Sequence, residues 1–182
     1  ATQNNNRLNL IDFGGALGTS YFQNLAFLKH LDELSWNIVE QKKFVDYGRE
    51  LFADQNLHFF HSIEKCLQSQ NAKVILFSSI LQYMEQPYEF LKQIENFEFI
   101  IIDRTPFFAD KDRIVIQKVS PKIYDASYHC WIFNEKKFVD FFIKEMGYQL
   151  VADFEAHIGT IIELDDSQAT YKGFILKKYN II

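Results

Sequence analysis

The 182-residue chain is predicted to form a single α/β domain, residues 1–182, around a mostly parallel sheet. Short apolar runs alternate with amphipathic stretches, which is typical of strand–helix–strand units. The run at residues 73–78 (KVILFS) is almost entirely apolar, as expected for a strand that helices cover on both faces. Beyond residue 104 the alternation gives way to a β-rich end, so a symmetric dinucleotide-binding sheet is not expected.

Each element of the first half follows from a local pattern. Residues 8–13 form the first strand, and after a glycine-rich turn a helix is expected over about residues 19–34, with an apolar face made of Phe22, Leu25, Ala26 and Leu28. Further strands are expected at residues 36–40, 57–60, 73–78 and 98–103. Helices are expected between them at residues 44–54 and 63–68 and after Pro87, whose fixed φ suits the first turn of a helix.

The second half is expected to begin with a long insertion, residues 104–128, that holds an extra strand at residues 113–119. A helix over residues 135–146 ends at Gly147, a residue suited to the position after a helix. The last strands are expected at residues 149–155 and 173–179, with a further segment near residues 159–164.

Composition narrows the function classes. The net charge is -5 and the basic residues are scattered, which argues against a nucleic-acid surface. Two isolated cysteines form neither a disulfide framework nor a zinc site and indicate reduced thiols in the cytoplasm. No apolar run approaches the roughly 20 residues that span a bilayer. The polar start has no signal-peptide core, and because it lacks Met we expect a chain cut from a longer protein.

The first turn is the strongest candidate binding site. Gly14, Gly15 and Gly18 allow the backbone to turn sharply and approach a ligand, and the following helix offers free N–H groups. In open parallel sheets, ligands bind at the carboxyl end of the strands where the strand order reverses. A tight turn without a ligand is the alternative interpretation.

An acid follows the turn at the expected distance. Glu40 closes the second predicted strand 22 residues after Gly18, where a carboxylate can accept hydrogen bonds from both ribose hydroxyls. By itself it could be a solvated acid at the end of a strand. Turn and acid together predict a nucleoside-bearing cofactor.

Two features choose among such cofactors. Asp12 lies two residues before Gly14, where its charge would repel a pyrophosphate and favour the ammonium of an amino-acid tail. Ala16 stands where the dinucleotide pattern G-x-G-x-x-G has its second glycine. Both features favour S-adenosylmethionine over NAD.

Residues 12–18 (DFGGALG) resemble motif I, D/E-x-G-x-G-x-G, of class I S-adenosylmethionine-dependent methyltransferases. Residues 36–40 look like the second strand of that family with its ribose-binding acid, and residues 74–83 and 86–88 like its fourth strand and the helix after it. Residues 103–107 and 116–119 are similar to an uncharacterised group of bacterial methyltransferases, which also carry a segment before motif I that is absent here.

The resemblance implies a Rossmann-like three-layer sandwich. Its sheet would have seven mostly parallel strands with an antiparallel C-terminal strand, plus a short β insertion after the fifth strand. It also implies methyl transfer from S-adenosylmethionine to a small-molecule or saccharide-type acceptor.

The chain departs from the family pattern at two places. Ala16 replaces the middle glycine of motif I, which is tolerable if its φ stays below zero. The acid that often binds adenine after the third strand is absent, and His61 and Ser62 stand there. The residues predicted to bind the cofactor are Asp12, Gly14, Gly15, Gly18, Glu40, Ser62, Ser78 and Ser79.

Candidates for catalysis lie at the strand ends and in the insertion. His129 is the candidate base, because the charge of a histidine changes near neutral pH, and Tyr128 beside it is a second candidate. The favoured alternative is that His129 is a loop histidine without a special role. Arg104 could pair with an acidic group of the substrate or, equally, form a structural pair with an acid of the insertion. His58 and His61 would point to opposite faces of a strand, so no metal site is predicted.

Two other functions remain open. One is an NAD-binding oxidoreductase, against which Asp12 argues. The other is a methyltransferase fold that serves as a non-catalytic binding domain, which the missing adenine acid and the lack of a clear base favour. The acceptor and the oligomeric state are not predicted.

Overall fold

The computed structural model describes residues 1, 5–94, 96–119, 121–122, 125–156, 161–164 and 167–179. The chain divides into two compact units, which are described separately. The first unit comprises Ala1–Ser78 and Phe97–Ile100, and the second comprises Ser79–Asn96 and Ile101–Ile182.

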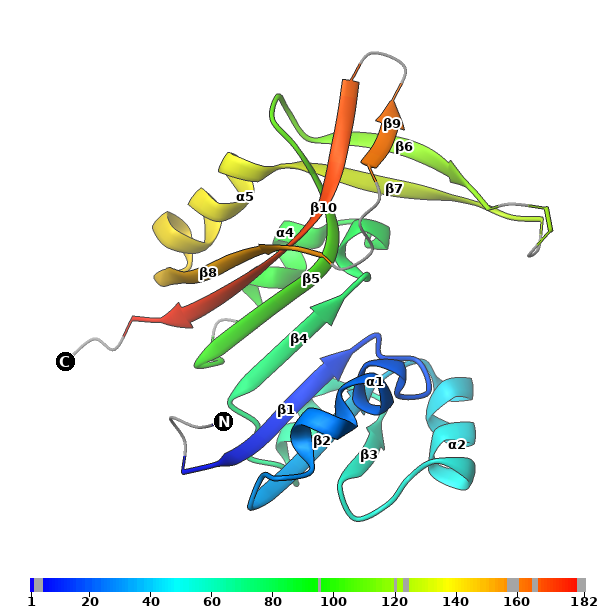
Figure 1. Cartoon of the computed structure of the whole chain (residues 1–182), viewed down its shortest axis with the longest axis vertical. Helices are drawn as coiled ribbons and strands as arrows, with labels where there is room; N and C mark the ends of the chain where they lie inside the picture. Colours follow the sequence, from blue (N-terminus) through cyan, green and yellow to red (C-terminus); the bar gives the residue numbers. More distant parts are fainter. Residues whose placement is uncertain are drawn as a thin grey trace. The chain divides into compact units, whose positions relative to one another are not determined.

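The first unit is built around four parallel strands that lie side by side in the order β3-β2-β1-β4 (Figure 1). The strands are β1 (Arg7–Phe13), β2 (Glu33–Val39), β3 (Leu57–Phe60) and β4 (Val74–Ser78). Three helices connect them: α1 (Thr19–Leu28), α2 (Lys42–Leu51) and α3 (Ile63–Leu67). The chain therefore runs from β1 outward through β2 to β3 and then returns to the other side of β1 at β4.

The middle of this sheet is buried on both faces. Successive residues of β1 (Leu10, Ile11 and Asp12) and of β4 (Ile75, Leu76 and Phe77) are all buried. Since successive side chains of a strand point to opposite faces, both faces must be covered, as the apolar run at residues 73–78 predicts.

Helix α1 differs from the sequence prediction in its length and in its buried face. It ends at Leu28 and not at residue 34, because β2 begins at Glu33. The predicted apolar face is largely exposed, with Phe22 at 48% and Leu25 at 37%. Tyr21 is buried instead, its ring 5.8 Å from that of Trp36, so this aromatic contact and not the 3.6-residue apolar pattern sets the buried side.

The second unit combines antiparallel strands with short helices. Strand β5 (Phe99–Phe108) begins in the first unit and continues here, followed in spatial order by β10 (Ser167–Lys178) and β8 (Tyr148–Glu155). Strands β8 and β9 (Ile161–Leu164) both pair antiparallel with β10, and β6 (Arg113–Lys118) pairs antiparallel with β7 (Ser127–Asn134). Its helical segments are the 3-10 helix η2 (Leu81–Tyr83), α4 (Pro87–Lys92), α5 (Glu135–Asp140) and the π-helical η3 (Phe141–Glu145).

Phenylalanine rings fill the core of the second unit. Phe107 lies 5.1 Å from both Phe138 and Phe174, and Phe133 lies 5.0 Å from Phe138, measured between ring centroids. All four rings are buried, and most of their pairs are tilted or edge-on, the geometry that aromatic pairs prefer. Many of the 19 phenylalanines therefore serve packing.

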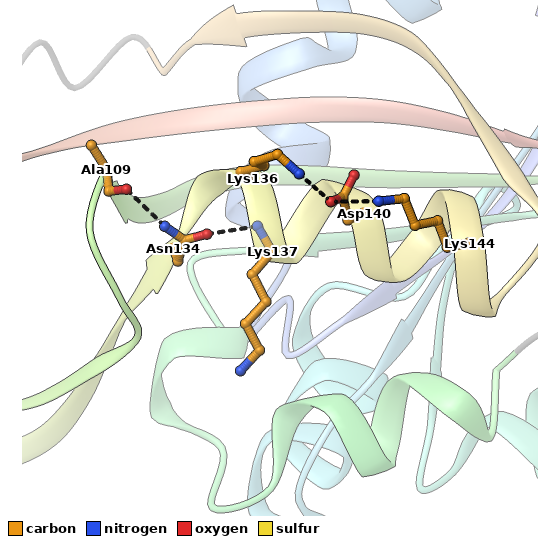
Figure 2. Close-up of polar contacts among 6 residues, drawn as sticks. All are labelled: Ala109, Asn134, Lys136, Lys137, Asp140 and Lys144. Atoms are coloured by element: carbon orange, nitrogen blue, oxygen red, sulfur yellow. Dashed lines mark hydrogen bonds and ion pairs between the residues drawn. The ribbon is translucent and has the colours of Figure 1, made fainter.

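Asn134 fixes the junction between β7 and α5 (Figure 2). Its side-chain oxygen accepts a hydrogen bond from the backbone N–H of Lys137 at 2.7 Å, which caps the helix. Its side-chain nitrogen donates to the carbonyl of Ala109 at 2.9 Å and to that of Asp110 at 2.5 Å. One buried amide thus ties the helix start to the loop after β5.

The fold class predicted from the sequence is confirmed: a Rossmann-like α/β arrangement with parallel strands first and antiparallel strands at the C-terminal end. The strand count exceeds the prediction, since the described residues form ten strands. The additional strand is β7. Its first two residues fall in the predicted insertion, outside the strand expected there, and no element was predicted for the others. Among the described residues no helix is long and apolar enough to cross a membrane.

Candidate functional site

The strands of the first unit end level with one another. Phe13, the last residue of β1, is in register with Val39 of β2 and with Phe77 of β4. Val39 is in turn in register with Phe60 of β3. The residues that follow these strands therefore emerge at one edge of the sheet, where the strand order reverses next to β1. They include Gly14, Glu40 and His61, and Ser78 is the last residue of β4 at the same edge.

The glycine-rich turn begins at this edge. Gly14 has φ of 74°, and its N–H donates to the carbonyl of Val39 at 2.9 Å. Gly18 has φ of 97°, a conformation that favours glycine, and its N–H donates to the carbonyl of Gly15 at 2.9 Å. The turn is thereby held against the end of β2, directly before Glu40.

The sequence analysis required a negative φ at Ala16, and the structure does not meet this condition. Its φ is 51° and not negative, so a residue with a Cβ occupies the left-handed region here. The middle residue of the turn needs the same left-handed backbone that a glycine would adopt without strain. Ala16 therefore carries backbone strain within the candidate site.

Asp12 is wholly buried beneath the turn. Its carboxylate accepts a hydrogen bond from the indole N–H of Trp36 at 3.0 Å. A Cβ added to Gly15 would lie 2.6 Å from the carboxyl carbon and from one oxygen of Asp12. The absence of a side chain at Gly15 is what allows the backbone of the turn to rest on this carboxyl group.

Glu40 is half-buried at the end of β2. Its backbone N–H donates to the carbonyl of Phe60 at 3.1 Å, which fixes its main chain between β1 and β3. One carboxylate oxygen accepts from the N–H of Gln41 at 2.6 Å. A carboxylate has about four lone-pair sites, so this bond leaves acceptor capacity for other donors.

Ser62 begins helix α3. Its hydroxyl oxygen accepts from the backbone N–H of Lys65 at 3.2 Å, the usual bond of an N-cap serine. A hydrogen bond from the same hydroxyl lowers the pKa of Glu64. Both capacities of the hydroxyl are thus used within its own helix, which leaves little for a ligand.

Ser78 is the last residue of β4, and Ser79 opens the second unit. Ser79 has φ of 57°, and its N–H donates to the carbonyl of Asp103 at 3.0 Å. Arg104, after Asp103, has φ of 50°. Two residues of the second unit that carry side chains, Ser79 and Arg104, thus adopt left-handed backbone, and such strain is often found at functional sites.

The second unit contains a cavity of about 850 Å³. Its polar lining includes the side chains of Ser79, Tyr83, Arg113, Gln117, Glu163 and Tyr171. Its apolar walls come from β6, β7 and β9. The cavity is large enough for a small molecule and offers hydroxyl, amide, guanidinium and carboxylate groups.

Two tyrosines of this cavity belong to a connected group. The hydroxyl of Tyr83 donates to Gln117 Oε1 at 3.0 Å, and its ring lies 6.2 Å from that of Tyr128. Burial raises the pKa of Tyr171, and the neighbouring Tyr83 and Cys130 raise it further. Tyr171 is therefore a neutral hydrogen-bonding group at physiological pH.

The predicted catalytic residues are not brought together with this cavity. None of Arg104, Tyr128 and His129 is among its lining residues. Tyr128 and His129 lie in strand β7, opposite Gln117 and Ile116 respectively, so their side chains point to opposite faces of the hairpin. Arg104 forms an ion pair at 3.2 Å with its sequence neighbour Asp103, which precedes the insertion whose acids were considered as partners.

The sequence analysis missed four polar residues of the cavity: Arg113, Gln117, Glu163 and Tyr171. Arg113 lines it and packs over the ring of Phe108 at 4.5 Å. In β6 the half-buried residues Arg113, Val115 and Gln117 alternate with exposed ones. The sequence does not reveal this alternation, because Ile114, Val115 and Ile116 are all apolar and two of them are exposed. Tyr171 and Glu163 carried no signal either, because their neighbours come from strands far apart in the chain.

Neither cysteine is suited to reaction. Cys66 and Cys130 are free and buried, and burial raises the pKa of Cys66 to about 12 and that of Cys130 to about 11. Among the described residues no group of His, Cys, Asp and Glu could hold a metal ion.

Neither models of protein families nor curated proteins match the sequence. Solved structures do match. The structure of LepI in complex with SAM aligns with a TM-score of 0.62 at 11% identity, over 95% of this chain and 43% of LepI. The glycopeptide N-methyltransferase MtfA complexed with S-adenosyl-L-methionine gives 0.61 at 8% identity, over 94% of this chain and 87% of MtfA.

A SAM-dependent methyltransferase from Methanosarcina mazei gives a TM-score of 0.60 at 8% identity, over 97% of this chain and 96% of that one. The chain has the class I methyltransferase fold. It spans less than half the length of LepI. In this methyltransferase fold the glycine-rich turn occupies the end of the first strand, as the motif I resemblance implied.

Proposed function

We propose that this chain binds S-adenosylmethionine at the turn between β1 and α1 and transfers the methyl group to a small-molecule or saccharide-type acceptor. The observation that carries the proposal is the level register of Phe13 with Val39, which brings the glycine-rich turn next to Glu40. The complexes of LepI and MtfA with the same cofactor support it.

The residues at the turn fit this cofactor. Gly14 and Gly15 are partly exposed and have no side chain to keep a ligand from the backbone. Beneath them the buried charge of Asp12 favours an ammonium group and disfavours a pyrophosphate, which supports S-adenosylmethionine over NAD. Glu40 would accept hydrogen bonds from the ribose hydroxyls.

The remaining cofactor residues keep the roles predicted for them. Gly18 would start the helix whose N–H groups face the ligand, and Ser78 and Ser79 would contact it from the end of β4. Ser62 is the weakest member of the set, because its hydroxyl is engaged within α3.

The cofactor supplies a methyl carbon bound to a positively charged sulfur. The chain itself would contribute chiefly by holding the acceptor in line with that carbon. We place the acceptor in the cavity lined by Tyr83, Arg113 and Tyr171. Arg113 lines the cavity and would pair with an acidic group of the acceptor, a role first expected of Arg104. His129 as a base and Tyr128 beside it remain predictions.

Location and partners follow from the same features. Both cysteines are free and buried, which supports the predicted cytoplasmic location. The scattered basic residues support a small-molecule partner and not a nucleic acid.

Calorimetric titration with S-adenosylhomocysteine tests the proposal, with NAD as the competing ligand. We expect the first to bind and the second not to. Glu40→Gln should weaken binding roughly 10- to 100-fold, because hydrogen bonds to a charged acceptor are lost. Glu50→Gln on the exposed side of α2 removes the same charge nearby and should change nothing. Binding of NAD alone would overturn the proposal, and binding of neither ligand would favour a non-catalytic domain.

A further inference from the structure

Strand β9 has an open edge within the second unit. Among the described residues it pairs only with β10, and Ile161–Leu164 make no other backbone hydrogen bond within that part of the chain. In an antiparallel pair, every second residue directs its N–H and C=O away from the partner strand. Two of the four residues of β9 therefore offer a backbone donor and acceptor that no described strand uses.

The cavity of the second unit lies along this open edge. All four residues of β9 line it, although successive side chains of a strand point to opposite faces. A cavity that touches four consecutive residues of a strand follows an edge of that strand and not one face. Residues 167–170 of β10, which pair with β9, do not line the cavity. The cavity therefore follows the edge that faces away from β10.

The hairpin of β6 and β7 presents one of its faces to the same cavity. Five lining residues share this face: Arg113, Val115, Gln117, Cys130 and Ile132. Arg113 lies opposite Ile132 and Val115 lies opposite Cys130, and directly opposed residues of two strands share a face. A chain that runs along β9 can therefore turn every second side chain toward this face of the hairpin.

The volume of the cavity fits a short extended peptide. A strand within a layered sheet occupies about 160 Å³ per residue, from a rise of about 3.4 Å, a strand spacing of about 4.8 Å and a sheet spacing of about 10 Å. The cavity of about 850 Å³ therefore holds roughly five such residues. This length matches the four residues of β9.

The charge of the lining favours an acidic residue in that peptide. Arg113 is the only cationic side chain among the described lining residues, and its guanidinium carbon lies 4.5 Å from the ring centroid of Phe108. Its ion pair with the exposed Asp110 is long, at 3.8 Å. A guanidinium has five N–H donors, so it can bind a carboxylate of a ligand as well.

A saccharide matches the strand edge less well. A peptide repeats its backbone donors and acceptors every two residues, at the spacing that the edge of a strand itself has. The hydroxyl groups of a saccharide have no such repeat. The apolar lining residues Val115, Ile132 and Ile162 also suit aliphatic side chains better than sugar rings.

We propose that this cavity binds a short peptide in an extended conformation, which pairs with the open edge of β9 and places an acidic side chain at Arg113. This inference rests on the proposed function in one respect, because the peptide is then the class of acceptor that the cavity takes. The pairing itself lies within the second unit, to which all the lining residues belong.

Fluorescence anisotropy with a labelled, capped pentapeptide of sequence VTDTV tests the pairing. Its β-branched residues favour the extended form, and its valines and aspartate share one face. We expect saturable binding with a Kd below about 1 mM. Absence of such binding would overturn the proposal.

Two N-methylated forms of this peptide distinguish strand pairing from binding through side chains alone. One form carries methyl groups on the valine and aspartate amides, and the other carries them on the threonine amides. Alternate N–H groups of a strand point to the same side, so only one of the two sets faces β9. One form should bind at least about tenfold more weakly than the parent peptide, and the other less than about threefold more weakly. Equal effects in both forms would overturn the proposal.

The peptide VTNTV and the variant Arg113→Gln test the charge. The unaltered chain should bind VTNTV about tenfold more weakly than VTDTV, because a charged hydrogen bond is lost. Arg113→Gln should bind the two peptides equally within about twofold. Ile114→Gln is the matched control, since Ile114 is exposed and does not line the cavity, and it should retain the tenfold preference. Equal binding of both peptides by the unaltered chain would overturn the acidic specificity.

Competition with maltotriose addresses the saccharide alternative. An excess of maltotriose should leave the anisotropy of bound VTDTV unchanged. Displacement of the peptide would show that the cavity takes saccharides and would overturn the choice of a peptide.

Failure of the cofactor assignment is distinguishable from failure of this inference, because the peptide titrations contain no cofactor. If VTDTV binds and S-adenosylhomocysteine does not, the proposed function fails and the cavity remains a peptide site. If S-adenosylhomocysteine binds and VTDTV does not, only this inference is wrong.

Discussion

Gly15 lies so close to Asp12 that a Cβ on the glycine would sit 2.6 Å from the buried carboxylate. The acid of the motif is thus not an exposed ligand but a charge beneath the turn, held by the indole N–H of Trp36. The turn needs a glycine at this position because a side chain there would collide with the carboxyl group of Asp12. Both residues are therefore expected to behave as one unit.

The first prediction concerns Gly15→Ala. The added methyl meets the carboxyl group of Asp12, which is buried and cannot move away freely, so we expect the free energy of unfolding to fall by about 1–3 kcal/mol. Urea denaturation followed by circular dichroism measures the change. In an Asp12→Ala background the same substitution should cost much less, because the group it meets is gone. Equal costs in the two backgrounds would contradict the steric explanation.

The second prediction concerns Ala16→Gly. Ala16 has φ of 51°, which costs a residue with a Cβ about 1–2 kcal/mol. Glycine removes that strain, but its greater conformational entropy favours the unfolded chain by about 0.4–1 kcal/mol. The net effect should be an increase of up to about 1 kcal/mol in the free energy of unfolding. Ala26→Gly is the matched control, since Ala26 is exposed within α1 and should lose about 1 kcal/mol. Thermal denaturation of both variants should therefore show shifts of opposite sign.

The third prediction concerns Asn134→Ala. The substitution removes the cap of α5 and the bond to the carbonyl of Ala109, both drawn in Figure 2. It also leaves the carbonyl of Asp110 without the same donor. Loss of an N-cap costs about 1 kcal/mol and loss of further hydrogen bonds about 1 kcal/mol each, so the free energy of unfolding should fall by about 2–3 kcal/mol. Ser62→Ala removes only a cap, that of α3, and should cost about 1 kcal/mol in the same assay. A similar loss in both variants would show that the bonds to the loop contribute little.

The fourth prediction concerns pH and the buried thiols. Burial raises the pKa of Cys66 from 9.0 to about 12, so the folded chain keeps this proton at a pH where the unfolded chain releases it. The resulting stability is fully present below pH 9 and is lost as the pH rises toward 12. Denaturation between pH 8 and pH 10 should show a smaller decline for Cys66→Ser than for the unaltered chain, because serine does not ionise there. Identical declines would place the pH dependence elsewhere.

A related measurement uses thiol reactivity. Both cysteines are buried and their thiols are protonated at neutral pH, so iodoacetamide should label neither in the folded chain. In urea both should be labelled, as mass spectrometry would show. Fast labelling of Cys130 without urea would mean that the cavity it lines admits the reagent.

Local patterns in the sequence determined much of the first unit. The apolar runs at residues 57–60 and 73–78 gave strands close to their observed bounds, and the glycine-rich turn lies at the end of β1 as predicted. These predictions succeeded because a strand's burial and a turn's glycines are encoded within a few neighbouring residues. The position of Glu40 directly after β2 was predictable for the same reason, since it depends only on where that strand ends.

Tertiary contacts decided what local patterns did not encode. The contact of Tyr21 with Trp36 set the buried side of α1, and pairing with β6 made a strand of the segment that holds Tyr128 and His129. Those two side chains then lie on opposite faces, which their adjacency in the sequence conceals.

The glycine-rich turn and its acid were therefore determined by the sequence alone, because each is a local feature of one strand and the turn after it. Only the tertiary structure decided three other features: the contact of Gly15 with Asp12, the positive φ of Ala16 and the cavity that Ser79 lines. The physical reason is distance along the chain. Tyr83 and Gln117, which share a hydrogen bond in that cavity, are 34 residues apart, and only the packing of separate strands brings such groups together.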